Sequence, residues 1–165
     1  MALTNNVFKR FYEEPKVIED DISWKSEGSG RFVIKDVNIV SNVLHNEDIR
    51  LYCTQNIFNN FAFIIVYYGE EKIVLVKYDK KIHPPDFIDK CSGNSITEPH
   101  KHYFKENCPG GIRKVIPSHE IDRNDVNRAF MQFLDECNIR LLGEYEKLSI
   151  IRQTSLMQFY SEELK

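Results

Sequence analysis

Two long apolar runs, separated by a short polar break, constrain the fold of this chain more than any other feature of its sequence. The runs are residues 61–68 and 73–78, and both are rich in the β-branched and aromatic residues that strands favour. The break at residues 69–72, Gly-Glu-Glu-Lys, has the length and chemistry of a hairpin loop. Because neither run alternates apolar with polar residues, both are predicted to be central strands, covered on both sides or by a helix and a tightly curved sheet.

Further strands are expected on both sides of this hairpin. Residues 31–41 and 48–54 precede it and share its enrichment in β-forming residues. Residues 100–105 and 112–116 follow it as shorter candidates. The run Asn-Cys-Pro-Gly-Gly at 107–111 has strong turn chemistry, so these two are predicted to form a second hairpin.

After Pro117 the apolar period changes from two to about 3.6, which predicts a helix over residues 122–138 with Asp122 as its N-cap. Its apolar positions recur at spacings of three and four: Val126, Ala129, Phe130, Phe133, Leu134 and Cys137. Such a stripe has to be buried, and the sheet is the expected partner. The sequence therefore predicts an α+β fold, a curved, mostly antiparallel sheet of about five to seven strands packed against a C-terminal amphipathic helix.

One core domain is expected, flanked by two shorter segments. Residues 1–30 are predicted to form an arm or a short helix that ends in a flexible joint. Residues 31–138 form the core, and residues 139–165 form a helical tail with a break at Gly143. The tail is expected to pack on the same domain or against a partner chain, so a homo-oligomer is one option.

Composition excludes several classes of protein. The 165 residues include only 7 Gly and 6 Pro, which argues against a collagen-like or low-complexity chain. No apolar run approaches the roughly 18 to 20 residues that a membrane-spanning helix needs. The first residues lack the basic and apolar regions of a signal peptide, so a cytoplasmic location with reduced cysteines is expected. Cys53 and Cys137 are then predicted to be buried packing residues.

The stretch that carries chemistry contains three of the five histidines, His83, His100 and His102. Alternate residues of a strand share a face, so the second and third of these should point the same way, about 6.5 to 7 Å apart, with Phe104 continuing the row. Asp79 and His83 come just past the end of a neighbouring predicted strand, where a returning loop would bring them to the same space.

Paired imidazoles suit metal-independent cleavage of RNA. One neutral imidazole takes the proton of the ribose 2′-hydroxyl while an imidazolium protonates the leaving oxygen. A cation has to stabilise the charge on phosphorus, and Lys77, Arg113 and Lys114 lie on neighbouring strands. Tyr103, inside the motif, is a further substrate-binding candidate, whereas Lys101 should point to the opposite face.

Other interpretations of the same histidines stay open. His100 and His102 with Cys91 and Cys108 give the pattern Cys-x8-His-x-His-x5-Cys, a ligand set that zinc accepts. The pattern lacks the short Cys-x2-Cys spacing of well-marked zinc sites. The alternatives to a cofactor-free catalytic site are therefore a zinc site, a non-enzymatic module that binds nucleic acid, nucleotide or protein, and a polar surface without function.

The formal net charge of −3 gives no global case for nucleic-acid binding, but it hides a local basic segment. A charge run is most often a solvated face, although this one surrounds the histidines and suits phosphate. Its seven cations are Lys80, Lys81, Lys90, Lys101, Lys105, Arg113 and Lys114.

The motif residues also carry a family resemblance. Their order is Lys77-Tyr78-Asp79, His83, Pro99-His100-Lys101-His102 and a helix that contains residues 133–138. Over roughly residues 60–138 this order resembles the TumE-like family of small bacterial toxin–antitoxin proteins and its uncharacterised Pro-His-x-His relatives. The resemblance implies a toxin-type or defence-associated protein that acts on RNA, with Asp79, His83, His100 and His102 at the matching positions. It also implies a cognate antitoxin or a second copy of the chain as the partner of the tail.

Overall fold

The computed structural model describes residues 2–80, 88–89, 91, 93, 99–108 and 121–149, and the backbone of residues 112–117. Its helices are α1 (Asn5–Glu13) and α2 (Val126–Glu136). Its strands are β1 (Lys16–Ile18), β2 (Ile22–Ser23), β3 (Lys25–Ser26), β4 (Phe32–Asn38), β5 (Asp48–Gln55), β6 (Phe61–Tyr68), β7 (Lys72–Asp79), β8 (His100–Phe104), β9 (Ile112–Pro117), β10 (Ile139–Leu141) and β11 (Tyr145–Glu146).

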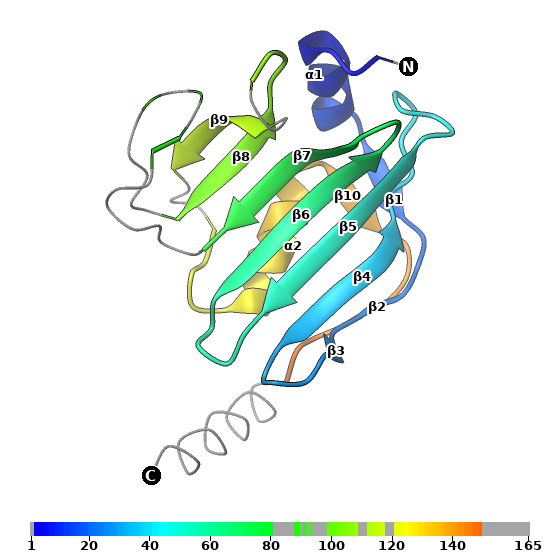
Figure 1. Cartoon of the computed structure of the whole chain (residues 1–165). Coiled ribbons are helices and arrows are strands. Elements are labelled where there is room, and N and C mark those ends of the chain that lie inside the picture. The colour runs from blue at the N-terminus through cyan, green and yellow to red at the C-terminus, as the bar shows by residue number, and fades with distance from the viewer. Residues whose placement is uncertain are drawn as a thin grey trace.

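Within the described residues, strands β3 to β9 form one seven-stranded sheet in chain order, each antiparallel to the next. Figure 1 shows this twisted meander with α2 behind its central strands. The predicted α+β fold is confirmed, and so are both predicted hairpins, β6–β7 and β8–β9.

The covered face of the sheet holds the aromatic core. Phe63 on β6 lies 5.6 Å from Phe130 and 5.4 Å from Phe133 of α2, measured between ring centroids. Tyr78 on β7 stacks against Phe63 at 5.9 Å. These contacts explain why the two apolar runs become central strands, because their alternate residues meet the apolar stripe of the helix.

Helix α2 buries the stripe that its sequence predicts, but it begins later than expected. Its N-cap is Asp125, which accepts hydrogen bonds from the backbone N–H groups of Asn127 and Arg128. Asp122 instead accepts from the N–H of Asn124 in the approach to the helix. Both residues are of the capping type, and the one that directly precedes the first apolar helical residue caps it.

The opposite face of the central strands, called here the open face, carries no helix among the described residues and is turned to the viewer in Figure 1. Ala62 and Ile64 of β6 are half-buried on this face. Their apolar character marks the floor of a groove described below rather than a second covering layer.

The segments that flank the sheet belong to the same core. Phe8 and Phe11 of α1 are buried in it, and β1 pairs in parallel with β10. Likewise β2 pairs in parallel with β11. The expected arm is therefore packed, and the described part of the expected helical tail, residues 139–149, contains two short strands instead of a helix.

The cysteines divide into two pairs. Cys53 and Cys137 are buried free thiols. Cys91 and Cys108 are joined in a disulfide with their Cα atoms 6.0 Å apart, so the expectation of four reduced cysteines is wrong for this pair. Cys91 precedes β8 in the chain and Cys108 follows it. No helix within the described ranges is long and apolar enough to span a bilayer.

Candidate active site on the open face

The candidate residues lie in two adjacent rows that cross the open face. In antiparallel strands, directly opposed residues place their side chains on the same face. The first row is Tyr52, Ile64, Lys77 and His102, and the second is Thr54, Ala62, Asp79 and His100, each from β5 to β8. The register therefore brings together four of the predicted site residues, the two histidines with Lys77 and Asp79.

The two imidazoles are in contact. The ring centroids of His100 and His102 lie 4.5 Å apart in an edge-to-face arrangement. His100 is 0% exposed, whereas His102 is half-buried. Only His102 is thus accessible to a ligand, with His100 behind it.

Each imidazole faces a charged side chain across the β7–β8 pair. Lys77 lies opposite His102 and Asp79 lies opposite His100. Lys77 Nζ is 3.6 Å from Asp79 Oδ2, and both side chains are largely buried, at 28% and 12% exposed. The positive charge of Lys77 is therefore partly compensated within the site.

These charges stand at one end of a groove of about 460 Å³ on the open face. Ala62 and Ile64 belong to its lining, as do the side chains of Lys77 and Asp79. Its other polar lining residues are Arg31, Tyr52, Thr54, Gln55, Asn56 and Asn60. The groove therefore combines an apolar floor with a charged end and a polar end, which suits a ligand of mixed chemistry.

Arg31 is the groove residue that sequence reasoning missed. Its Nη2 donates a hydrogen bond to the Tyr52 hydroxyl at 2.8 Å. No carboxylate of the described residues forms an ion pair with it. Its only sequence signal is its position after the Gly-Ser-Gly turn, and the pairing of β4 with β5 brings it to the groove.

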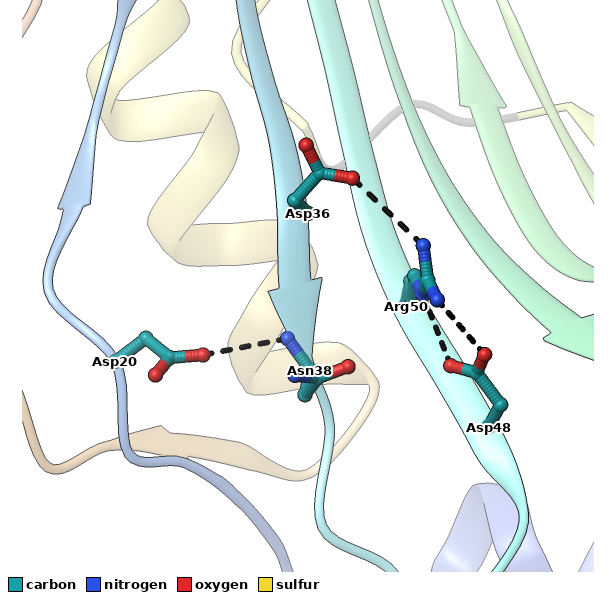
Figure 2. A network of polar contacts seen from close by, with 5 residues as sticks. All are labelled: Asp20, Asp36, Asn38, Asp48 and Arg50. Atoms are coloured by element: carbon teal, nitrogen blue, oxygen red, sulfur yellow. Dashed lines mark hydrogen bonds and ion pairs between the residues drawn. The ribbon is translucent and has the colours of Figure 1, made fainter.

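Arg50, also on β5, shows the contrasting case. Figure 2 shows its guanidinium held by Asp48, at 2.9 Å from both carboxylate oxygens, and by Asp36 at 3.7 Å. Nearby, Asp20 accepts a hydrogen bond from the backbone N–H of Asn38. Arg50 is therefore neutralised by its neighbours, whereas Arg31 in the groove forms no ion pair with the described carboxylates.

Tyr103, a predicted substrate-binding residue, lies on the other face of β8. Its hydroxyl donates to Glu136 Oε1 of α2 at 2.8 Å, and Lys101 Nζ donates to the same oxygen at 2.5 Å. Burial raises the pKa of the Tyr103 hydroxyl far above its ordinary value. Strand alternation, applied to Tyr103 as it was to Lys101, accounts for this correction.

Phe104 does not continue the histidine row. The register shifts between Tyr103 and Phe104, and the Phe104 ring packs against Phe8 of α1 at 5.8 Å. The expected row thus ends at His102, because a bulge turns the next residue toward the core.

The remaining candidates differ in what the structure says of them. Arg113 and Lys114 lie on β9, where Lys114 is opposite Tyr103 and Val115 is opposite His102, and their side chains lie outside the described part. His83 also lies outside it. Since the sulfurs of Cys91 and Cys108 are bonded to each other, they are not available as zinc ligands in this state.

The motif's resemblance to the TumE-like family remains a prediction, and so do its implied roles for His83, His100 and His102. Among the described residues, no three His, Cys, Asp or Glu side chains converge as a metal site would require. Comparison of the chain with protein-family models, with curated proteins and with solved structures found no match.

Proposed function

We propose that the open face cleaves RNA without a metal ion, with His102 as the base that touches the substrate. The supporting observation is the arrangement of side chains next to Lys77, which lines one end of the groove. There, half-buried His102 lies 4.5 Å from the ring of buried His100 and opposite Lys77 in the register. Imidazole is the side chain best suited to move protons near neutral pH, and a neighbouring ammonium stabilises charge on phosphorus.

In the proposed reaction, His102 takes the proton of a ribose 2′-hydroxyl as its oxygen attacks the adjacent phosphorus. A bond forms between phosphorus and the 2′-oxygen, and the bond to the 5′-oxygen breaks. The ammonium of Lys77 gives this leaving oxygen a proton. The products are a 2′,3′-cyclic phosphate and a 5′-hydroxyl end, and the proton on His102 returns to Lys77 through water.

His100 and Asp79 have a different role in this proposal. His100 is fully buried, so we assign it to positioning the His102 ring rather than to direct proton transfer. Asp79 lies opposite His100, and its carboxylate holds the ammonium of Lys77 in an ion pair. This division revises the expectation that both imidazoles touch the substrate.

The burial of His100 also favours a second candidate, a module that binds RNA without cleaving it. A site with only one accessible imidazole can hold a ligand by charge and packing alone. This candidate predicts binding by the same groove, with no turnover under any condition.

Cleavage of a labelled RNA oligonucleotide in EDTA tests the proposal. His102→Ala should lower the rate about 10²- to 10⁴-fold, the range that general acid–base groups contribute. His100→Ala should lower it less and shift the midpoint of the pH–rate profile, which a purely structural loss would not do. His45→Ala, in an exposed turn, is the matched control and should cleave like the wild type. Equal cleavage by wild type and His102→Ala would refute the proposal.

The order of motif residues shared with the TumE-like family supports a bacterial toxin–antitoxin or defence setting for this activity. We accordingly propose a cytoplasmic protein with RNA and a cognate antitoxin as its partners. Residues 139–149 pack on the domain through β10 and β11. The proposal therefore assigns antitoxin binding to residues 150–165, which lie outside the described part.

A further inference from the structure

The geometry points to a nucleotide subsite at the Arg31–Tyr52 end of the groove, which binds single-stranded RNA laid across strands β5 to β8. This inference rests on the proposed function and names its substrate class. In it, one base packs on Tyr52, one phosphate pairs with Arg31, and a phosphodiester two or more nucleotides further along the chain reaches His102.

The length of the first row fits this assignment. Tyr52 and His102 are separated by three inter-strand steps through Ile64 and Lys77. Each step is about 4.8 Å, so the row spans about 14 Å. That span separates an anchoring subsite from the reacting group, which lets binding energy at one end position the other.

The charges give the anchoring subsite its preference for phosphate. Arg31 donates one hydrogen bond to the Tyr52 hydroxyl. It forms no ion pair with a carboxylate of the described residues. Lys77 shares its charge with Asp79. The remaining N–H donors of a guanidinium can bind two phosphate oxygens at once, so Arg31 is a stronger phosphate anchor than Lys77.

The lining beside Arg31 suits a base. The half-buried Tyr52 ring and Ile64 supply apolar surface for stacking. Asn60, also in the lining, is exposed, and its side-chain amide can donate to and accept from the edge of an unpaired base.

Unpaired bases favour single-stranded over duplex RNA. In a duplex the base edges and faces are occupied by pairing and stacking, so the subsite could take only phosphate. A protein partner would also meet Arg31, but it would not need the stacking surface of the Tyr52 ring beside it.

Binding of a labelled, uncleavable 2′-O-methyl RNA oligonucleotide, followed by fluorescence anisotropy, tests the subsite separately from cleavage. Arg31→Met should raise Kd about tenfold and reduce the slope of log Kd against log salt by about one. Tyr52→Leu should raise Kd roughly tenfold through lost stacking, while Tyr52→Phe, which keeps the ring, should raise it much less. Lys35→Met, an exposed position on β4 outside the groove, is the control and should bind like the wild type.

The outcomes separate this inference from the proposed function. Unchanged Kd in both Arg31→Met and Tyr52→Leu, or tighter binding of a duplex than of the single strand, would overturn the subsite. If Arg31→Met and Tyr52→Leu still cleave RNA with an unchanged KM, the subsite is overturned but the proposed function is not. Binding with the expected losses but no cleavage of ordinary RNA by the wild type would keep the subsite and refute the proposed function.

Discussion

Lys16 shows what a single buried charge does in this fold. Its side chain is 2% exposed, and Nζ donates to the carbonyl oxygens of Phe11, Tyr12 and Glu14 at 2.7, 3.1 and 2.7 Å. These carbonyls lie at the C-terminal end of α1, where the helix has no N–H groups left to offer them. The C-cap residue of α1 is Glu14, and the side chain of Lys16 satisfies the carbonyls at this end of the helix. Burial lowers the pKa of its ammonium group to about 8.

Lys16→Met keeps the apolar stem but leaves these carbonyls without their donor. We expect the free energy of unfolding in urea to fall by about 2–4 kcal/mol at neutral pH. The matched control is Lys25→Met on β3, an exposed position that should change it by less than about 0.5 kcal/mol. A loss as small as that of the control would show that water replaces the ammonium group at no cost.

The same group predicts a pH dependence of stability. Its folded pKa, about 8, lies below the ordinary value of 10.5, so between these values the unfolded chain binds more protons than the folded one. The contribution of Lys16 to stability therefore rises with pH across that window. Between about pH 7 and 9.5, the free energy of unfolding of the wild type should therefore rise relative to that of Lys16→Met. A difference between the two that falls with pH would contradict the assignment.

Among the elements, β8 is tethered at both ends by one disulfide. Cys91 precedes the strand and Cys108 follows it, 17 residues apart in sequence. In the chain-entropy account, closing a loop of about this length destabilises the unfolded state by about 3 kcal/mol. The strand that carries the histidines is thus the one to which the redox state of the protein matters most.

Reduction with dithiothreitol should lower the free energy of unfolding by about 3 kcal/mol. The double variant Cys91→Ser, Cys108→Ser should have the lower stability from the start and should not respond to the reductant. Burial raises the thiol pKa of Cys53 and Cys137, so neither should react with a thiol reagent in the folded protein. A wild type whose unfolding ignores reductant would show that the bond is not formed in solution.

Elements with a strong local period could be predicted from the sequence, while those that depend on distant partners could not. The β6–β7 hairpin and α2 follow from alternation and from a stripe that needs burial. In contrast, β10 exists because it pairs with β1, more than a hundred residues earlier, and no local pattern specifies that partner. Its single β-branched residue, Ile139, is too weak a signal beside the surrounding helix formers.

The candidate site divides in the same way. Alternation within β8 predicted that His100 and His102 share a face, and the nearby chain supplied Lys77 and Asp79. Arg31 could not be found, because it reaches the groove through pairings of β4, β5 and β6 whose registers the sequence does not state. Which of two adjacent histidines is buried also depends on everything packed around them.

In the molecule as a whole, the first and last described segments lock together at Gly143. A Cβ atom at this position would lie 2.5 Å from the carbonyl oxygen of Asp20 and 2.7 Å from Asp21 Oδ1. The next residue, Glu144, donates its N–H to Asp21 Oδ1 at 2.8 Å and accepts from the N–H of Ile22 at 2.8 Å. Only glycine allows this approach of two backbones without a shift.

Gly143→Ala should therefore destabilise the protein by about 1–3 kcal/mol, because β2 and β11 have to move apart to admit the methyl group. Thermal unfolding should show one transition at a lower Tm, since both segments share the central core. Leu142→Ala, at the exposed neighbouring position, is the control and should leave Tm within about 2 °C of the wild type. Equal Tm values for the two variants would mean that the contact is loose in solution.

The two faces of β8 make different contacts: one carries the paired histidines, and the other binds α2. His100 and His102 lie on the open face. Lys101 and Tyr103 lie on the covered face, where both donate hydrogen bonds to Glu136. These hydrogen bonds join β8 to α2, and the Tyr12 hydroxyl of α1 donates to the same carboxylate oxygen of Glu136. Substitution of His100 or His102 should therefore leave β8 in place, because the contacts that hold the strand against α2 are made by the residues of its other face.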